Sequence, residues 1–453
     1  MRKIETHHPR VPWSWVTWMT LPWISFFYIE NISSVPLTFT LRKFIDNPGL
    51  IAFVGSLNVA FNFIVGMVTS YMSDRIWTPL GRRRPFLIAG WAGLALALFF
   101  VPLAENVWTL VALIVIYQFC ADIAKPLEPL FNEVVPPAQR GRAATIRSVG
   151  QSLMNIVFLA VLVAQFDRLY HFEFFNRSTT LSGEALLYWI GCAALLAAIA
   201  VLFFFVRETP PPATVAKEPF VFRRFFHDVF GQRQWWNVYL LYSVPIVSGA
   251  GIGLFDPLLR TEQLGFAKSQ YGWAATAGTV LNLILFIPAA GFLTDRVPRL
   301  VLLRFSIIAR ALLGLAFFIY LRFAAHYSIP FVTLIVFDVS ASAFSACIAL
   351  VWGPLVYDYI PSERFGTVSA GLSFVSGIAP FVLTNLAGVW VGGFTSLFGP
   401  QGRGTHDYSS IYILQLLAAG AALALIGYLR REERAGRLVR LGADASLMNK
   451  EEG

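Results

Sequence analysis

Three ionisable side chains stand close together inside a long apolar run, in the stretch CADIAKPLEPLFNE at 120–133. Asp122 and Lys125 are three residues apart and Glu128 follows after three more, so in one continuous helix they would fan over about 120°. A charged group inside a membrane costs about 2.5–3.5 kcal/mol on insertion scales, so such residues are candidates for function. A carboxylate here could bind and release a proton. Alternatively, Asp122 and Lys125 could neutralise each other and only fix helix packing.

A fourth ionisable candidate, Glu30, lies in the first apolar run, six residues before Pro36. The predicted site for a coupling proton or cation, with contacts to substrate, consists of Glu30, Asp122, Lys125 and Glu128. Neutral donors and acceptors, with one acid and one serine from the second half, would bind a polyol: Tyr28, Asn31, Gln118, Gln151, Asn155, Asp338 and Ser342. A serine in a helix can equally bond a backbone carbonyl, so each hydroxyl also has a structural interpretation.

Membrane helices are the elements that must hold these groups. Hydrophobic residues make up 57% of the 453 positions and charged residues 13%, against roughly a quarter charged in an average soluble domain. A hydrocarbon core of about 30 Å needs roughly 20 apolar residues per helix. An all-α membrane protein with twelve transmembrane helices is predicted, at 13–38, 49–72, 86–104, 107–131, 144–166, 186–206, 236–258, 271–293, 300–321, 329–356, 367–395 and 410–429.

The distribution of charge indicates how the chain lies in the membrane. The formal net charge is +9, but the basic residues are spread over short loops, which argues against nucleic acid as a partner. If both termini are cytoplasmic, the cytoplasmic segments hold far more Lys and Arg than the outer loops, as the positive-inside rule requires. A multi-pass protein of the cell (inner) membrane is therefore expected. The six histidines lie in loops or tails, so no His-based catalytic set or metal site is expected at membrane depth.

Short matches relate the two halves of the chain. VPL at 35–37 corresponds to DPL at 256–258, and SDR at 73–75 to TDR at 294–296, both displaced by 221 residues. NEVVPPAQRG and YDYIPSERFG match with a displacement of 225. A nearly constant displacement indicates a duplicated six-helix unit, which is a transporter architecture. The predicted parts are an N-terminal bundle at 1–206, a cytoplasmic linker at 207–235, a C-terminal bundle at 236–430 and a cytoplasmic tail at 431–453.

Loops at the cytoplasmic ends of the predicted helices carry acids and arginines in both halves. In MSDRIWTPLGRRRPF at 72–86 the arginines could serve only to orient the chain. An acid beside them and a second copy in the other half favour ion pairs that form in one conformation only. The predicted cytoplasmic gate consists of Asp74, Arg75, Arg82, Arg83, Glu133 and Arg140 in the first half, and of Asp295, Arg296, Asp358 and Arg364 in the second.

The same stretch resembles the loop between the second and third helices of the major facilitator superfamily, which carries G-x4-D-R-x-G-R-R. Its acid and arginines match Asp74, Arg75, Arg82 and Arg83, whereas Ser70 replaces the first glycine. The longer form, SDR followed by LGRRRPF, is similar to the glycoside–pentoside–hexuronide:cation symporters, particularly to sucrose-transporter-like proton-coupled sugar transporters.

Two further stretches bear on this resemblance. The first helix of those sugar transporters carries an acid six residues before a proline, and Glu30 with Pro36 reproduces that spacing. Their fourth helix carries P-x-R-A-L-x-x-D, where this chain has PLEPLFNE, with Glu128 at the arginine position and Glu133 at the terminal acid. Glu128 therefore reverses the charge at a position that faces the substrate in those transporters. This difference argues against sucrose itself as the substrate.

The resemblance implies a secondary active transporter, a proton- or cation-coupled sugar or glycoside symporter that works by alternating access. One alternative is export or import of an amphipathic, cationic or zwitterionic solute by the same fold; another is a transport-inactive membrane receptor. No ATP-binding G-x4-G-K-[ST] motif is present, so uphill transport would use an ion gradient. No enzymatic activity and no cofactor are expected. The expected partners are a small solute, a coupling ion and the lipid bilayer, and a monomer is consistent with this architecture.

Overall fold

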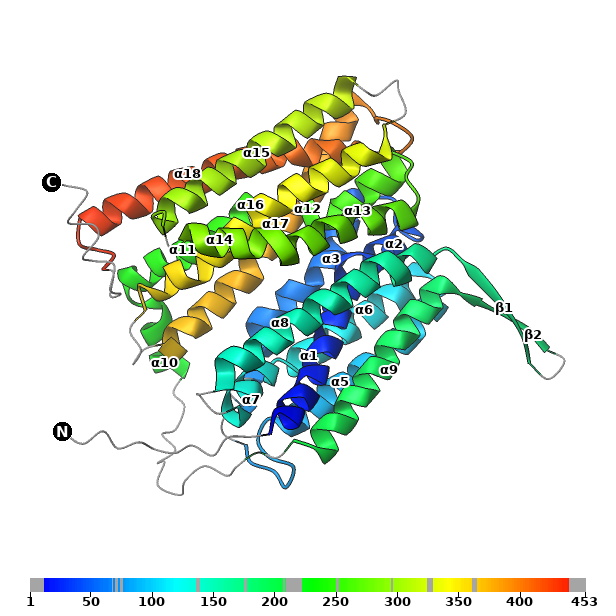
Figure 1. The fold of residues 1–453 in the computed structure, drawn as a ribbon, viewed down its shortest axis with the longest axis horizontal. Coiled ribbons are helices and arrows are strands. Elements are labelled where there is room, and N and C mark those ends of the chain that lie inside the picture. The colour runs from blue at the N-terminus through cyan, green and yellow to red at the C-terminus, as the bar shows by residue number, and fades with distance from the viewer. Residues whose placement is uncertain are drawn as a thin grey trace. The chain divides into compact units, whose positions relative to one another are not determined.

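A computed structural model describes residues 12–66, 68–69, 72–73, 76–135, 139–174, 177–206, 208, 222–249, 252–294, 296–323, 329–360 and 365–439. The chain forms two compact units. The first comprises Met1–Phe44 with Ile64–Lys217, and the second comprises Ile45–Phe63 with Glu218–Gly453. Both units consist mainly of helices (Figure 1).

In the first unit, α5 packs against α6 and α9, and α1 packs against α8 and α9. The helices are α1 (Trp13–Ser34), α2 (Pro36–Arg42), α5 (Arg84–Phe100), α6 (Val107–Ile123), α7 (Leu127–Val134), α8 (Arg140–Val157) and α9 (Gly183–Phe204), with short turns η2 (Val101–Leu103), η4 (Phe158–Leu162) and η5 (Val163–Gln165). Pro36 begins α2, where its missing N–H costs no helical hydrogen bond. The predicted span at 13–38 is therefore divided at Val35.

The predicted span at 107–131 is also interrupted. α6 ends at Ile123, a turn occupies 124–126, and α7 begins at Leu127. Pro126 explains the break, because proline has no N–H and disfavours a helical conformation in the residue before it. The continuous helix expected to carry Asp122, Lys125 and Glu128 is thus wrong. Asp122 lies on α6, Lys125 in the turn and Glu128 on α7.

The second unit contains the longest helices. They are α3 (Pro48–Phe61), α10 (Phe222–Phe230), α11 (Arg233–Ser248), α12 (Ile252–Leu258), α13 (Lys268–Leu281), α14 (Ile287–Thr294), α15 (Arg299–Phe323), α16 (Phe331–Tyr357), α17 (Phe365–Phe398) and α18 (Ile411–Arg434), with turns η6 (Leu259–Gln263), η7 (Asn282–Phe286) and η10 (Tyr408–Ser410). A further turn, η1 (Asn62–Gly66), continues the chain from α3 into the first unit. In the second unit α15 packs along α16 and α18 (Figure 1).

Helix α3, which the sequence assigns to the first half, packs against α17 within the second unit. The approach is close because a Cβ added at Gly388 would lie 2.5 Å from Cβ of Ala52 and 2.8 Å from the carbonyl oxygen of Pro48. Asn385 donates a hydrogen bond of 2.8 Å to the hydroxyl of Ser56. A glycine and one polar contact thus hold these two helices together.

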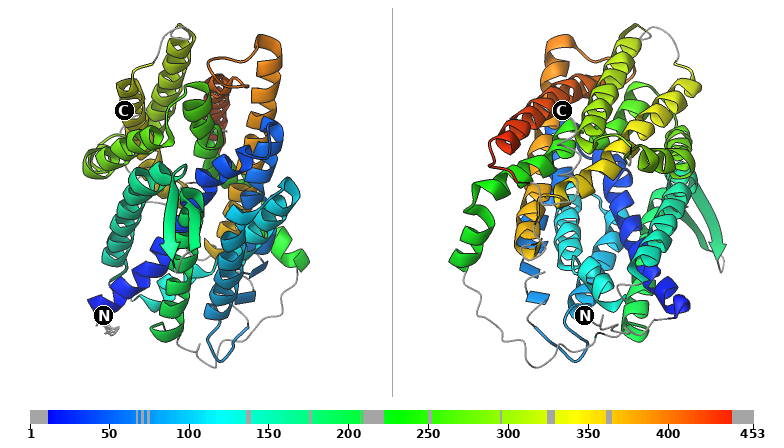
Figure 2. Two further views of the ribbon diagram at one scale, coloured as in Figure 1. Left: turned by 90° about the vertical axis from the view of Figure 1, so that its right-hand side faces the viewer. Right: turned by 60° about the vertical axis from the view of Figure 1, so that its left-hand side comes forward.

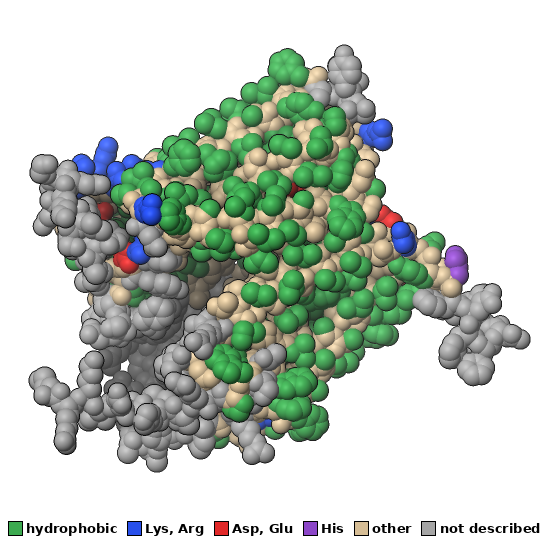
Figure 3. Space-filling view, in the orientation of Figure 1, with side chains coloured by type: hydrophobic (Ala, Val, Ile, Leu, Met, Phe, Trp, Pro, Cys, Tyr) green, Lys and Arg blue, Asp and Glu red, His purple; other side chains and the backbone are tan. Residues whose placement is uncertain are grey.

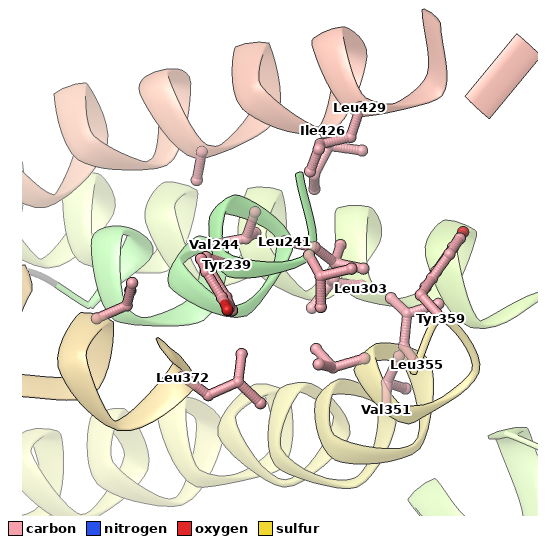
Figure 4. Packing of buried hydrophobic residues seen from close by; sticks show 14 of the residues in the cluster. Tyr239, Leu241, Val244, Leu303, Val351, Leu355, Tyr359, Leu372, Ile426 and Leu429 are labelled. Atoms are coloured by element: carbon pink, nitrogen blue, oxygen red, sulfur yellow. The ribbon is translucent and has the colours of Figure 1, made fainter. Parts of the chain in front are cut away.

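The core of the second unit gathers side chains from six helices, among them α10, which contributes Val229. α11 contributes Tyr239 and Leu241, α15 contributes Leu303, and α18 contributes Ile426 and Leu429 (Figure 4). α16 and α17 complete the cluster with further apolar side chains. Because these helices belong to one packed cluster, the polar groups that they carry are held in fixed positions.

The surface and the helix lengths show a multi-pass integral membrane protein. Nine helical segments of the described residues are long and apolar enough to cross a membrane. Two shorter apolar helices occur at Pro48–Leu57 and Val107–Ile123. Hydrophobic side chains predominate on the face seen in Figure 3, as expected where lipid is the solvent. The predicted all-helical membrane fold is confirmed.

A β-hairpin, which was not predicted, joins η5 to α9 in the first unit. Its strands are β1 (Leu169–Phe174) and β2 (Arg177–Ser182), which pair antiparallel. The hairpin extends beyond the ends of α8 and α9 (Figures 1 and 2). Gly183 allows the chain to turn into α9, because a Cβ there would lie only 1.7 Å from the carbonyl oxygen of Gln165.

Candidate functional site

The first unit buries an incompletely bonded polar cluster at the end of α6. Gln118 and Asp122 are each 1% exposed and lie four residues apart, on one face of the helix. Oδ1 of Asp122 lies 3.8 Å from Nζ of Lys125. Oδ2 of Asp122 and both side-chain amide atoms of Gln118 have no hydrogen-bond partner in the structure. Buried polar atoms are rarely left in this state, so the cluster is the leading candidate site.

Lys125 and Tyr117 connect this cluster to α1. Lys125 lies in the turn after α6, with its ammonium 6.0 Å from the centre of the Phe26 ring, and its charge also acts on Glu30. The hydroxyl of Tyr117 donates to the carbonyl oxygen of Ile29 at 3.0 Å. Of the four predicted ionisable residues, Asp122 and Lys125 are therefore brought together, and Glu30 lies within electrostatic range of Lys125. The side chain of Glu128 lies outside the described residues.

The neutral residues predicted to bind a polyol are in more varied positions. Tyr28 is buried, and its hydroxyl donates to the carbonyl oxygen of Leu187 at 2.8 Å, which attaches α1 to α9. Nδ2 of Asn31 lies 3.9 Å from the sulfur of Met154 on α8. Gln151 and Asn155 follow one another at helical spacing on the same helix and are both half-buried. Tyr28 therefore has a structural contact, whereas α8 presents a polar face.

The second unit contains an ion-pair triad of Asp256, Arg260 and Asp338. Nη1 and Nη2 of Arg260 lie 2.5 and 2.6 Å from the two oxygens of Asp338. On its other side the guanidinium contacts Asp256, with Nε 2.9 Å from Oδ2 and Nη2 3.0 Å from Oδ1. The Tyr412 hydroxyl is 3.4 Å from Oδ1 of Asp256, and the Tyr271 ring lies 5.5 Å below the guanidinium. The triad carries one net negative charge.

Sequence reasoning identified Asp338 but missed the other two members of the triad, Asp256 and Arg260. Asp256 was noted only as part of the repeated DPL, and Arg260 was placed in an outer loop. The structure continues the helix through the π-turn η6, and from there Arg260 bonds Asp338 on α16. The available signal was their spacing of four residues across the predicted helix end, which suits an ion pair. Ser342 packs against α13, because a Cβ at Gly278 would lie 2.8 Å from its hydroxyl.

A cavity of about 310 Å³ lies beside the break between α11 and α12, and Gly249 and Thr384 are among the residues that line it. Its wall is mostly apolar. Arg310 lies close by, since a Cβ at Gly249 would be 3.7 Å from its Nη2. Arg310 forms no ion pair among the described residues.

The structure describes only some residues of the predicted cytoplasmic gate. Asp74, Arg75, Asp295 and Arg364 lie outside the described residues, as do the side chains of Glu133 and Arg140. In the second unit, Asp358 at the end of α16 pairs with Arg299 at the start of α15 at 2.7 Å. Arg296 stacks instead on the ring of Phe292, 3.8 Å from its centre.

Arg82 and Arg83 form a binding site for a carboxylate that sequence analysis did not identify. The carboxylate of Glu208, which follows α9, accepts the backbone N–H groups of Arg82 at 3.0 Å, Arg83 at 3.1 Å and Arg84 at 2.9 Å. Gly81 has φ +111°, and a Cβ there would lie 2.7 Å from Oε1 of Glu208. The glycine therefore admits the carboxylate, and the N-terminus of α5 is capped from a distant part of the chain.

Comparisons with known proteins assign this arrangement of helices and buried charges to a class of membrane transporters. The family model of the Major Facilitator Superfamily matches residues 15–255 and 241–447. The two matches together span nearly the whole chain. The chain belongs to the Major Facilitator Superfamily, and it is a transporter rather than an enzyme.

Solved structures resemble the chain in fold at low sequence identity. A D-xylose–proton symporter gives a TM-score of 0.66 at 15% identity, covering 91% of this chain and 97% of the symporter. A POT family peptide transporter gives 0.65 at 12% identity, covering 94% and 97%. A bacterial homologue of the human lysosomal transporter Spinster gives 0.62 at 16% identity, covering 92% and 95%. No curated protein matches the chain.

Proposed function

We propose that the protein is a proton- or cation-coupled symporter of a sugar or glycoside. It would cross the cell membrane with twelve helices and have both termini on the cytoplasmic side. The observation that carries this proposal is the buried cluster of Gln118, Asp122 and Lys125, with polar atoms that have no partner in the part of the chain that the structure describes. The D-xylose–proton symporter, similar in fold, supports a sugar and a proton as ligands.

The cluster contains the groups that coupled transport of a neutral solute requires. A sugar has no charge of its own, so the transporter must bind the coupling ion through its own carboxylate. Asp122 has one oxygen near Lys125 and another without a partner, which leaves a position for a proton or a small cation. The amide of Gln118 lies one turn away and can exchange hydrogen bonds with a hydroxyl group. Binding of ion and solute at neighbouring groups would couple the two.

The remaining predicted residues are proposed to support this site. Glu30 lies within electrostatic range of Lys125, and it is proposed to share that cation with Asp122. Gln151 and Asn155 extend the polar surface along α8. Glu128 is proposed to contribute a second carboxylate from α7. Alternation between conformations would then be controlled at the helix ends, where Arg299 pairs with Asp358.

Net negative charge favours a second candidate function. Glu30 and Asp122 outnumber Lys125, and Asp256 and Asp338 outnumber Arg260. A cationic or zwitterionic solute would compensate this charge directly. The second candidate is therefore transport of such a solute, with the same fold and the same residues.

Transport by purified protein in liposomes tests the proposal. We expect accumulation of a labelled sugar driven by a proton or sodium gradient and abolished by an ionophore. Asp122→Asn should lose gradient-driven accumulation but keep exchange of labelled for unlabelled sugar, because exchange requires no net movement of the ion. Glu105→Gln, an exposed acid in the same unit, is the matched control. Exchange of organic cations without exchange of any sugar would refute the sugar assignment and support the second candidate.

A further inference from the structure

Two arginines, Arg304 on α15 and Arg430 on α18, lie near the end of the α15–α18 pair where α15 begins and α18 ends. α15 and α18 pack against each other and run in opposite directions in the second unit (Figure 1). Leu300, one turn before Arg304 on α15, lines the same small cavity as Arg430 of α18. The charge of Arg430 acts on Arg304, so the two cations lie within electrostatic range of each other. An anion bound near both would offset their repulsion.

No acid of the described residues supplies that anion. Neither Arg304 nor Arg430 forms an ion pair or a side-chain hydrogen bond in the part of the chain that the structure describes, and Nε of Arg304 is buried without a partner. The nearby carboxylates have other partners. Asp358 pairs with Arg299 at 2.7 Å, and Glu433 accepts the hydroxyl of Tyr359 at 2.8 Å.

Glu432, the remaining acid at this end of α18, is also engaged. Its carboxylate accepts two hydrogen bonds of 2.8 Å from Arg437, and these bonds raise the pKa of Arg437 above its ordinary value. Arg233 approaches the same carboxylate at 3.4 Å. No acid among the described residues at this end of the unit therefore pairs with Arg304 or Arg430.

The two arginines border a surface that faces lipid. Val301, Phe305 and Ile308 on α15 are 46%, 62% and 44% exposed, which is the pattern of a helix stripe in contact with hydrocarbon. Arg304 is five residues from the beginning of α15, or about 7.5 Å along the axis, and Arg430 is four residues from the end of α18, or about 6 Å. A long arginine side chain reaches the level of the lipid headgroups from this depth.

We propose that Arg304 and Arg430 form a binding site for the phosphate headgroup of an anionic lipid. Each guanidinium is a planar fork that can bond two phosphate oxygens, and basic pockets between membrane helices bind such headgroups. The exposed stripe on α15 would accommodate an acyl chain beside the headgroup. With the proposed orientation the site lies in the cytoplasmic leaflet, where anionic lipids are attracted by basic residues. The site is independent of which solute the protein carries.

Thermal stability of the delipidated full-length protein in detergent tests the site. The probes are phosphatidylglycerol, phosphatidylcholine and inorganic phosphate at equal phosphorus concentration, and the variants are Arg304→Gln and Arg430→Gln. Arg431→Gln is the matched control, because it removes the same charge from an exposed residue at the same helix end. A ligand that binds the native state raises Tm. We expect phosphatidylglycerol to raise Tm of the wild type and the control, with an apparent affinity about tenfold lower or worse in the two variants.

Each other outcome overturns the proposal. An equal effect of phosphatidylglycerol on all four proteins would show general attraction of basic residues to acidic lipid. An equal shift with inorganic phosphate would show a site for a free anion instead of a lipid. If Arg304→Gln fails to fold, Arg304→Lys replaces it. This variant keeps the positive charge but lacks the planar guanidinium, so it should bind phosphatidylglycerol more weakly than the wild type. Native mass spectrometry should then count fewer retained lipids, and an unchanged count would refute the site.

Discussion

Removing the carboxylate of Glu208 should release the start of α5 while leaving the rest of the first unit folded. The carboxylate accepts the backbone N–H groups of Arg82, Arg83 and Arg84, which would otherwise be unpaired donors at a helix N-terminus. In Glu208→Ala all three lose a charged acceptor. Because Glu208 follows α9 and the three N–H groups lie at the start of α5, the variant also removes a link between segments more than 120 residues apart, with sequence separations of 126, 125 and 124.

The expected cost follows from these contacts. An N-terminal cap contributes about 0.5–2 kcal/mol, and a carboxylate at the positive end of a helix dipole adds about 0.3–1 kcal/mol. With three donors affected at once, the free energy of opening this segment should fall by about 2–3 kcal/mol. Since 1.4 kcal/mol is a factor of ten, the opening constant should rise about 30- to 140-fold.

Hydrogen exchange of the amides of Arg82, Arg83 and Arg84 measures this constant directly. Glu208→Gln keeps one carbonyl acceptor but loses the charge, so it should fall between the wild type and Glu208→Ala. Gly81→Ala provides an independent perturbation, because its Cβ would lie 2.7 Å from Oε1 of Glu208 and its φ of +111° is strained for alanine. In the Glu208→Ala background only the backbone strain remains, so the two changes should cost less together than their sum. Unchanged exchange at these three amides in Glu208→Ala would refute the capping role.

Three further predictions concern buried contacts of the second unit. Arg260→Met should lower the free energy of unfolding by about 3–5 kcal/mol, because it leaves Asp256 and Asp338 buried without their cation. Thermal unfolding measures this loss, and a Tm equal to that of the wild type would contradict it. Gly388→Leu should separate α3 from α17, since even a Cβ at this position would lie 2.5 Å from Cβ of Ala52. A cysteine crosslink between these helices should then form more slowly than in the control Gly392→Leu, where a Cβ would have no atom within 4 Å. Asp407→Ala should destabilise the α18 start by about 2–4 kcal/mol, because Asp407 is fully buried and bonds Gln263 and Arg322; equal exchange of the amides of 408–410 would contradict this.

Hydrophobic pattern was sufficient to predict the class of fold, because a membrane requires long apolar helices whatever their packing. It did not locate the interruption at Pro126, since apolar residues continue on both sides of the proline and hide the turn. It also missed the β-hairpin at 169–182. A short hairpin depends on pairing between its own strands, and LYHFEF and RSTTLS are too brief to stand out from an outer loop.

Contacts between distant residues account for the remaining differences at the site. Asp122 and Lys125 are close in sequence, so their pairing was predictable from spacing alone. Glu208 was not, because its three partners are separated from it by 124–126 residues and no pattern marks a carboxylate that caps another helix. Arg260 lay between these cases. Its spacing of four residues from Asp256 could have indicated an ion pair. Because the apolar run ends at 258, however, the sequence predicts Arg260 in a loop.

The repeat relates the two buried clusters and shows how the halves differ. Tyr117 and Asp338 both lie in the fourth predicted helix of their half. In each unit this residue joins the fourth helix of the half to the first: Tyr117 donates to the carbonyl of Ile29 at 3.0 Å, and Asp338 accepts from Arg260 at 2.5 Å. The contact between these two helices is thus a neutral hydrogen bond in the first unit and an ion pair in the second.

This difference bears on which half can respond to a proton. The carboxylate of Asp338 has both oxygens engaged by one guanidinium, so protonation would break two strong hydrogen bonds. Asp122 has one oxygen 3.8 Å from Lys125 and one without a partner among the described residues. A proton can be added at Asp122 at the expense of a single weak contact. If the protein couples transport to protons, the first unit is therefore where the charge changes, while the triad keeps the second unit in one charge state through the cycle.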